Sequence, residues 1–207
     1  MSLKLLKSFC LFFCIFLVFA CGKKVSHKTV PDYSERGIRS IGVLPAMNKT
    51  NEIQAGRILR ERIIEELYFK GYPKIPGTTI DAKLSKSYKE GAKIPPSVVG
   101  EMLGVDAVLY CTISEWKTSF FLTYAVISVS VSFELRSSKT GEILWSTVKS
   151  VSRRSLDISK KEVELKTLQD YEAITHELVD AAMVNFPEGP NFIANAPQRK
   201  SWIRDWF

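Results

Sequence analysis

The sequence predicts an α/β fold: a single domain with a mixed β-sheet, an antiparallel hairpin and amphipathic helices packed against the sheet. One observation is a strictly alternating strand at residues 127–135, and another is an amphipathic helix at residues 53–70. The third is the order of the elements, in which strands and helices alternate before the hairpin and a last helix. The 207 residues, 45% hydrophobic and 25% charged, fit one globular domain.

The first half of the domain is predicted from apolar runs and their stop signals. Residues 38–44 form an apolar run that ends at Pro45, which predicts a buried strand. A loop at 45–51 leads to helix 53–70, and Gly71 marks the end of this helix. The helix carries an apolar stripe with a spacing of four residues: Ala55, Leu59, Ile63 and Leu67.

Charged residues of this helix are expected to face solvent. Arg57/Glu61 and Arg62/Glu66 are opposite-charge pairs at i,i+4. The same helical phase places Glu65 in water. Exposure does not raise a carboxyl pKa, so these carboxylates are poor candidates for acid catalysis.

The second half of the domain is predicted in the same way. We expect a short edge strand at 72–75, interrupted by Pro73, then helices at 80–88 and 95–103 and a core strand at 106–116. In strand 127–135 apolar residues alternate with serine and glutamate, and a turn at 137–141 leads to a pairing strand at 142–151. A second amphipathic helix is expected at 168–185.

The N-terminal residues have the pattern of a bacterial export signal. Lys4 and Lys7 precede an apolar run at 9–20, and Ala20 stands before Cys21. A Cys directly after the cut predicts a lipoprotein signal, with cleavage between Ala20 and Cys21 and lipid on Cys21. The alternatives are a plain secretory signal or an uncleaved anchor, although the run is shorter than the ~20 residues that span a bilayer.

The processed chain has three expected parts: a lipidated tether at 21–37, the α/β domain at 38–190 and a tail at 191–207. Gly22 is not the aspartate that favours inner-membrane retention, so we expect lipid anchoring at the cell outer membrane, with the domain periplasmic or surface-facing. The tail is aromatic and basic, and it either contacts a partner or membrane interface or folds back on its own domain. Its candidate contact residues are Trp202, Trp206 and Phe207.

Composition and motifs exclude several function classes. The net charge of +7 falls to +5 once the two lysines of residues 1–20 are subtracted, and the remaining basic residues form no stripe with aromatics, so no nucleic-acid partner is expected. Neither His27 nor His176 has a ligand cluster around it, so no metal site is expected, and no cofactor motif appears. Cys111 lies in an apolar strand and is expected to be a buried thiol, not a nucleophile. We therefore expect no enzymatic activity.

Several short runs, taken in their order and spacing, resemble the surface-antigen lipoproteins of Gram-negative bacteria. They are residues 41–48, 71–72, 103–110, 115–116, 141–145 and 187–190. This resemblance covers residues 38–190 and implies a fold similar to the amino-terminal domain of TolB and the periplasmic domain of the curli-secretion lipoprotein CsgG. It also implies a homodimer and outer-membrane attachment, and it supplies no catalytic residues. Phe19, bulky for its place in the signal, and Pro73 depart from the family pattern.

The leading functional hypothesis is a non-catalytic outer-membrane lipoprotein that acts in cell-envelope assembly or transport through protein–protein interaction. Its partners would be envelope proteins, such as other lipoproteins or a transporter, bound at a sheet edge or the aromatic tail. One alternative is a component of a CsgG-like secretion pore, since strand 127–135 also has the alternation of a membrane hairpin. A half-buried soluble strand gives the same pattern. The remaining alternative is an envelope enzyme.

Overall fold

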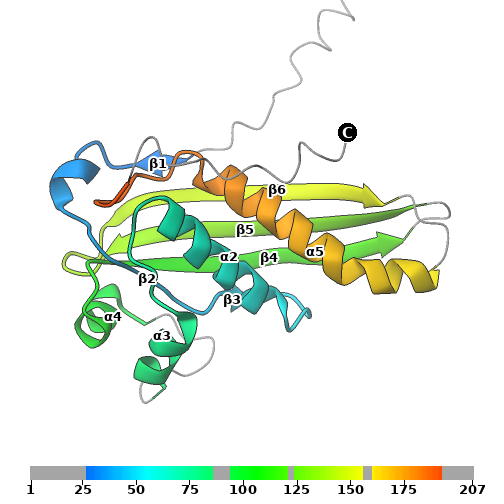
Figure 1. Ribbon diagram of the computed structural model, residues 1–207, viewed down its shortest axis with the longest axis horizontal. Helices are drawn as coiled ribbons and strands as arrows, with labels where there is room; N and C mark the ends of the chain where they lie inside the picture. Colours follow the sequence, from blue (N-terminus) through cyan, green and yellow to red (C-terminus); the bar gives the residue numbers. More distant parts are fainter. Residues whose placement is uncertain (1–26, 86–93, 121–123, 156–159, 193–207) are drawn as a thin grey trace, which may run out of the picture.

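The computed structural model describes residues 27–85, 94–120, 124–155 and 160–192. Its centre is a six-stranded mixed sheet of order β1-β6-β5-β4-β2, with β3 also paired to β4 (Figure 1). β2 and β3 run parallel to β4, and the remaining pairs are antiparallel. The strands are β1 (Lys28–Thr29), β2 (Ile41–Val43), β3 (Met47–Asn48), β4 (Ala107–Phe120), β5 (Ala125–Ser137) and β6 (Ile143–Ser155). The predicted mixed α/β fold is confirmed.

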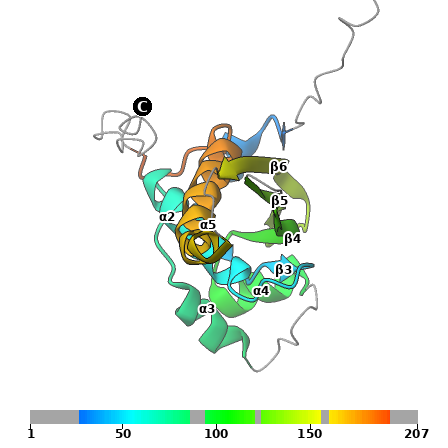
Figure 2. The same ribbon diagram turned by 90° about the vertical axis from the view of Figure 1, so that its right-hand side faces the viewer.

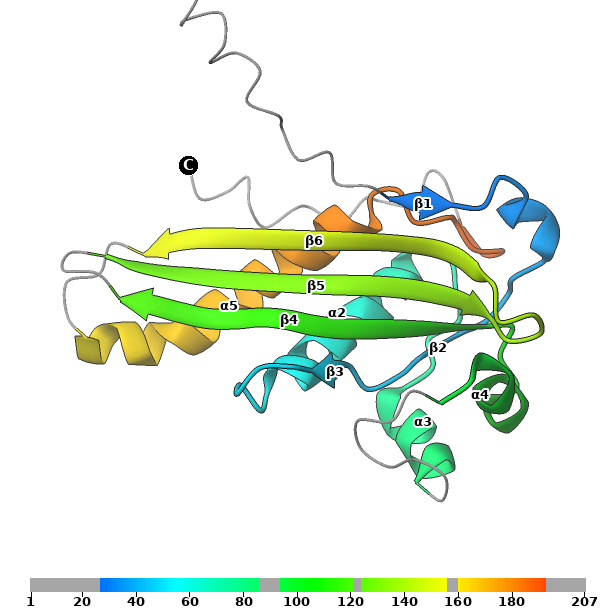
Figure 3. The same ribbon diagram turned by 180° about the vertical axis from the view of Figure 1, so that it is seen from behind.

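The strands β4, β5 and β6 form a long antiparallel meander, seen from its open face in Figure 3. Each is longer than predicted. In β4 the pairing shifts between Ile113 and Glu115, where a β-bulge lets both Ile113 and Trp116 face the core. After Trp116 the chain continues with the polar residues Lys117, Thr118 and Ser119, which explains why the sequence indicated a strand that ended at 116.

Two helices, α2 (Ala55–Phe69) and α5 (Lys160–Met183), cover one face of this meander (Figure 2). The predicted stripe of α2 is confirmed, because all four of its residues are buried in the main core. The alternating apolar residues of β5 are buried in the same core: Ile127, Val129, Val131, Phe133 and Leu135. This burial favours a half-buried sheet strand over a lipid-facing pore hairpin.

A second, smaller core lies on the other side of β4. Val108 is packed with α3 (Gly77–Leu84) and α4 (Pro96–Leu103), whereas its neighbour Leu109 belongs to the main core. Successive side chains of a strand point to opposite faces, so this end of β4 is buried on both. Helix α4 ends at Gly104, which has the left-handed φ of 70°.

The edge strand expected at 72–75 is absent, since residues 72–76 carry no regular structure. The backbone N–H of Tyr72 donates to Leu67 O at 3.0 Å, and that of Gly71 donates to Tyr68 O at 3.0 Å. These bonds close the C-terminal end of α2, with Gly71 at a φ of 90°. The backbone N–H groups of Gly71 and Tyr72 are therefore already bonded to the last turn of α2, and Pro73 has no N–H to donate to a neighbouring strand.

Residues 28–36 lie in the range expected to be a tether, but the structure builds them into the domain. β1 pairs with β6, and the short 3-10 helix η1 (Tyr33–Arg36) buries Tyr33, whose hydroxyl lies 2.9 Å from that of Tyr72. Near them, Gly189 N donates to Lys70 O at 2.7 Å. The first and last parts of the described chain therefore meet at the C-terminal end of α2 (Figure 1). None of the helices that the structure describes is long and apolar enough to cross a membrane.

Candidate functional site

The residues predicted to matter most for function lie outside the described part of the chain. They are the cleavage-site pair Ala20 and Cys21 and the tail aromatics Trp202, Trp206 and Phe207. Their roles stay predictions.

The described thiol and histidines do not form a reactive centre. Cys111 is free and buried, and burial raises the pKa of its thiol to about 12. A thiol with that pKa is protonated at neutral pH and is a poor nucleophile, as predicted. His27 is exposed and His176 is half-buried on α5. Among the residues that the structure describes, no group of three or more His, Cys, Asp or Glu side chains could hold a metal ion.

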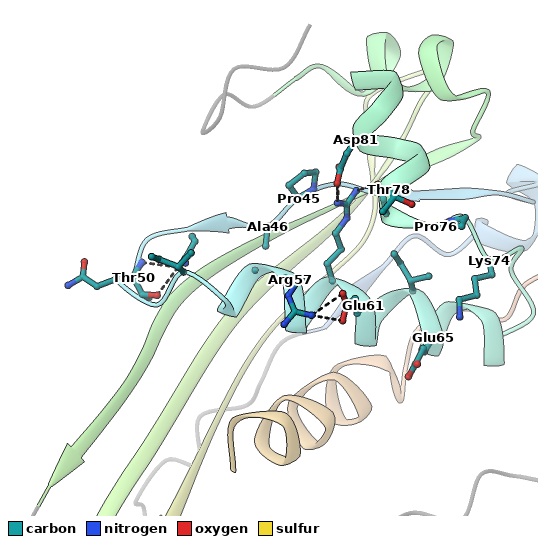
Figure 4. A pocket seen from close by; sticks show the side chains of 17 residues that line it. Pro45, Ala46, Thr50, Arg57, Glu61, Glu65, Lys74, Pro76, Thr78 and Asp81 are labelled. Atoms are coloured by element: carbon teal, nitrogen blue, oxygen red, sulfur yellow. Dashed lines mark hydrogen bonds and ion pairs between the residues drawn. The ribbon is translucent and has the colours of Figure 1, made fainter. Parts of the chain in front are cut away.

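A groove of about 840 Å³ runs between α2, α3 and the loop that follows β2 (Figure 4). The loop brings Ala46 and Thr50 to one side, and α3 brings Thr78 and Asp81 to the other. Ile53, 92% exposed, stands at its edge ahead of α2. No pattern in the sequence indicates this groove, because its walls come from segments that pack together only in the folded chain.

Arg60 is one of the residues that line the groove, and it connects α2, which carries it, with the end of β2 and with α3. Its Nε donates to Val43 O at 2.9 Å, and one terminal nitrogen donates to both carboxylate oxygens of Asp81 at 2.8 and 2.9 Å. On the rim, Arg57 pairs with Glu61 at 3.2 Å. These charged groups already satisfy one another, so they are arranged to hold the groove in shape.

The expectation that Arg62 and Glu66 face solvent is wrong. The Arg62 side chain is 2% exposed and lies between α2 and α5, where it is bonded to Glu65, Glu66 and Asp180. The Glu66 side chain is only 16% exposed. Position 62 lies beside the apolar stripe, and α5 covers it. The sequence could not show which helix would pack there. Arg57, Glu61 and Glu65 are exposed, as predicted.

The open edge of the sheet is the second candidate surface. β6 is paired with β5 from Ile143 to Ser155, but β1 covers it only at Trp145 and Ser146. Beyond Ser146 the described chain places no strand against this edge. An uncovered edge presents unpaired backbone N–H and C=O groups, which a further strand can bind.

The face of the sheet opposite α2 and α5 is polar in its outer half. Ser128 and Ser152 lie with their hydroxyls 3.0 Å apart, and Ser130 and Ser150 lie 2.8 Å apart. On the neighbouring strand Lys117 pairs with Glu115 at 2.8 Å. These hydrogen bonds pair the serine hydroxyls of neighbouring strands with each other, and such cross-strand pairs help to stabilise the part of the sheet that extends past the apolar core.

Comparisons with known proteins agree with this architecture. A protein from Neisseria meningitidis serogroup B (strain ATCC BAA-335 / MC58), described as "Putative lipoprotein NMB1124/NMB1162", is 26% identical over 127 residues. The match covers 59% of this chain and 59% of that relative.

The chain is also similar to solved structures. The crystal structure of lipoprotein GNA1162 from Neisseria meningitidis is 24% identical, with 63% of this chain and 94% of that chain covered and a TM-score of 0.53. The PelC dodecamer from Paraburkholderia phytofirmans is 17% identical, with 77% and 94% covered and a TM-score of 0.48. The family model described as "Putative lipoprotein GNA1162-like" matches residues 31–184, and the chain belongs to this family.

Proposed function

We propose that this protein is a lipid-anchored protein of the outer membrane that acts without catalysis, by binding other proteins in cell-envelope assembly or transport. Residues 1–20 are its signal peptide and Cys21 carries the lipid. Membership of a lipoprotein family supports the anchor. Gly22 after Cys21 supports the outer membrane over the inner one.

The open edge of β6 is the observation that carries the binding role. Val30 N donates to Leu144 O at 3.0 Å, so the backbone groups of Leu144 point away from β5. Backbone direction alternates along a strand, so those of Val148 and Ser152 point outward as well. An extended segment of a partner can therefore add to this edge as a further strand.

Charge limits which strand fits there. Lys149, Arg153 and Arg154 make the open length of β6 basic. Two such edges repel each other, so a second copy of β6 is a poor partner, and an acidic segment of another envelope protein is a better one. The homodimer expected for this protein then uses a different surface.

A proline substitution tests the edge. Val148 is 53% exposed, and Val148→Pro removes an outward N–H while the bonds to β5 remain. The matched control Val148→Thr changes the side chain and keeps the N–H. With a photo-crosslinking residue at Ser152 in the full-length protein in cells, we expect partner adducts in the wild type and Val148→Thr and their loss in Val148→Pro. Equal adducts in both variants would contradict strand addition, provided both melt at similar temperatures.

The anchor is tested separately with Cys21→Ser. We expect this variant to lose labelling by radioactive palmitate and to leave the membrane fraction, whereas Cys111→Ser keeps both. Palmitate label that persists in Cys21→Ser would show that the assignment of the lipidated residue is wrong.

A further inference from the structure

Both ends of the described chain converge on one end of the molecule, which we call the anchor end. It comprises β1, η1, residues 68–72 and residues 184–192. Hydrogen bonds join these segments: Asn191 N donates to Gly71 O at 3.1 Å, and the hydroxyls of Tyr33 and Tyr72 lie 2.9 Å apart. In Figures 1 and 2 they lie together on the upper side, opposite α3 and α4.

The chain between the proposed lipid and this end is short. Lys28 is already in the sheet, so six residues lie between it and Cys21, a distance of seven Cα-to-Cα steps. Fully extended, seven such steps reach roughly 25 Å. Strand β4, with 14 residues, is about 46 Å long, so the anchor end stays nearest to a bilayer that holds the lipid.

The anchor end also exposes aromatic and apolar side chains. Tyr68 is 58% exposed and Phe69 53%, with their ring centroids 6.0 Å apart in an edge-to-face arrangement. Val184, near the end of α5, is 69% exposed. Helices α2 and α5 run side by side here, because Arg62 of one is bonded to Asp180 of the other. Lys70 and Lys74 follow the aromatic pair.

This chemistry fits a membrane–water interface better than open water. Aromatic rings with a polar tip are enriched at the headgroup level, and lysines beside them reach phosphate groups. Glu188 at the same end is exposed, so net charge does not provide the attraction. The lipid on Cys21 keeps the domain close to the bilayer, and the aromatic and lysine side chains determine which end of the domain faces it.

We propose that the anchor end rests on the phospholipid surface, with Tyr68 and Phe69 at the level of the headgroups. The proposal rests on the lipid attachment at Cys21 proposed above. It places the other end of α2, where Ile53 is 92% exposed, away from the bilayer. A helix of 15 residues separates the two positions by about 22 Å.

Depth-dependent fluorescence quenching tests this orientation on the full-length acylated protein in vesicles of phosphatidylethanolamine and phosphatidylglycerol. Single cysteines at Tyr68, Val184 or Ile53, in a Cys111→Ala background, carry an environment-sensitive dye. Spin-labelled lipids are expected to quench the dye at the first two positions at least twofold more than at Ile53. Labelling Val184 keeps both aromatic rings in place, and Ile53 is a matched apolar control that lies two residues before α2, the helix that carries Tyr68 near its other end.

The outcomes separate the two proposals. Protein that floats with the vesicles and shows equal quenching at all three positions, or stronger quenching at Ile53, overturns the orientation and leaves the anchor intact. Protein that does not float with the vesicles overturns the anchor and the orientation together. Stronger quenching at Tyr68 and Val184 in floating protein supports both.

Discussion

Replacing Arg62 with methionine should destabilise the domain, although the sequence pattern of the helix indicates that this charged residue faces solvent. Removing one member of a buried ion pair typically costs 3–5 kcal/mol, because the other charge is left buried and unpaired. Here Glu65 and Asp180 are 49% and 41% exposed, so water can replace their partner, and only Glu66, at 16% exposed, loses an ion pair in a largely buried position. Arg62 Nε is itself buried without a hydrogen-bond partner, and methionine fills the space of the stem. We therefore expect a loss of about 2 kcal/mol.

Thermal and urea unfolding of the full-length protein measure this loss. For a chain of this size, about 2 kcal/mol corresponds to a fall in Tm of roughly 4–8 °C. Arg57→Met is the matched control, because Arg57 and Glu61 are 61% and 64% exposed and such pairs contribute less than about 1 kcal/mol. If the two variants unfold at the same temperature, or Arg62→Met is more stable than wild type, the buried pairing does not hold α2 to α5.

Two further predictions concern the core and the packing of the helices. Gly100→Ala should lower the free energy of unfolding by about 1–3 kcal/mol, because the added Cβ would lie 2.7 Å from Ser138 Oγ and closer still to Ser138 Cβ. Gly56→Ala is the control, because no atom lies nearer than 3.9 Å to its added Cβ, and it should not destabilise the domain. Urea unfolding of the two variants measures the difference. The Cys111 thiol has its pKa raised from 9.0 to about 12, so its contribution to stability is complete below pH 9 and is lost as the pH rises toward 12. Between these values, unfolding free energies should fall by up to about 1.4 kcal/mol per pH unit more steeply in the wild type than in Cys111→Ala, and equal slopes would contradict a buried neutral thiol.

The elements that the sequence predicted well are those in which a single periodicity decides the structure. Helix 53–70 and strand 127–135 have regular apolar spacing, and both are present with their apolar side chains buried. Helix 95–103 was also found nearly at its predicted bounds, since prolines open it and Gly104 ends it. Local sequence is sufficient where local signals agree with the tertiary contacts.

The features that the sequence did not reveal depend on partners far away in the chain. β1 exists because Lys28 and Thr29 meet β6, more than a hundred residues later, and a polar dipeptide has no strand signal of its own. Arg60 and Arg62 look like surface cations until α3 and α5 pack over them. The groove and the open edge of β6 are likewise products of topology, so no pattern of residue types could have located them.

The positions of β1 and the open edge bear on how attachment and binding can coexist. β1 covers β6 only at Trp145 and Ser146, at the anchor end, and the uncovered length begins just beyond it. With the anchor end on the bilayer, that length runs away from the point of attachment over about 30 Å, from Thr147 to Ser155. β1, which follows the proposed lipid attachment site in the chain, and the partner strand would then occupy different parts of the same sheet edge. A partner could be held close to the membrane while the attachment of the protein stays unchanged.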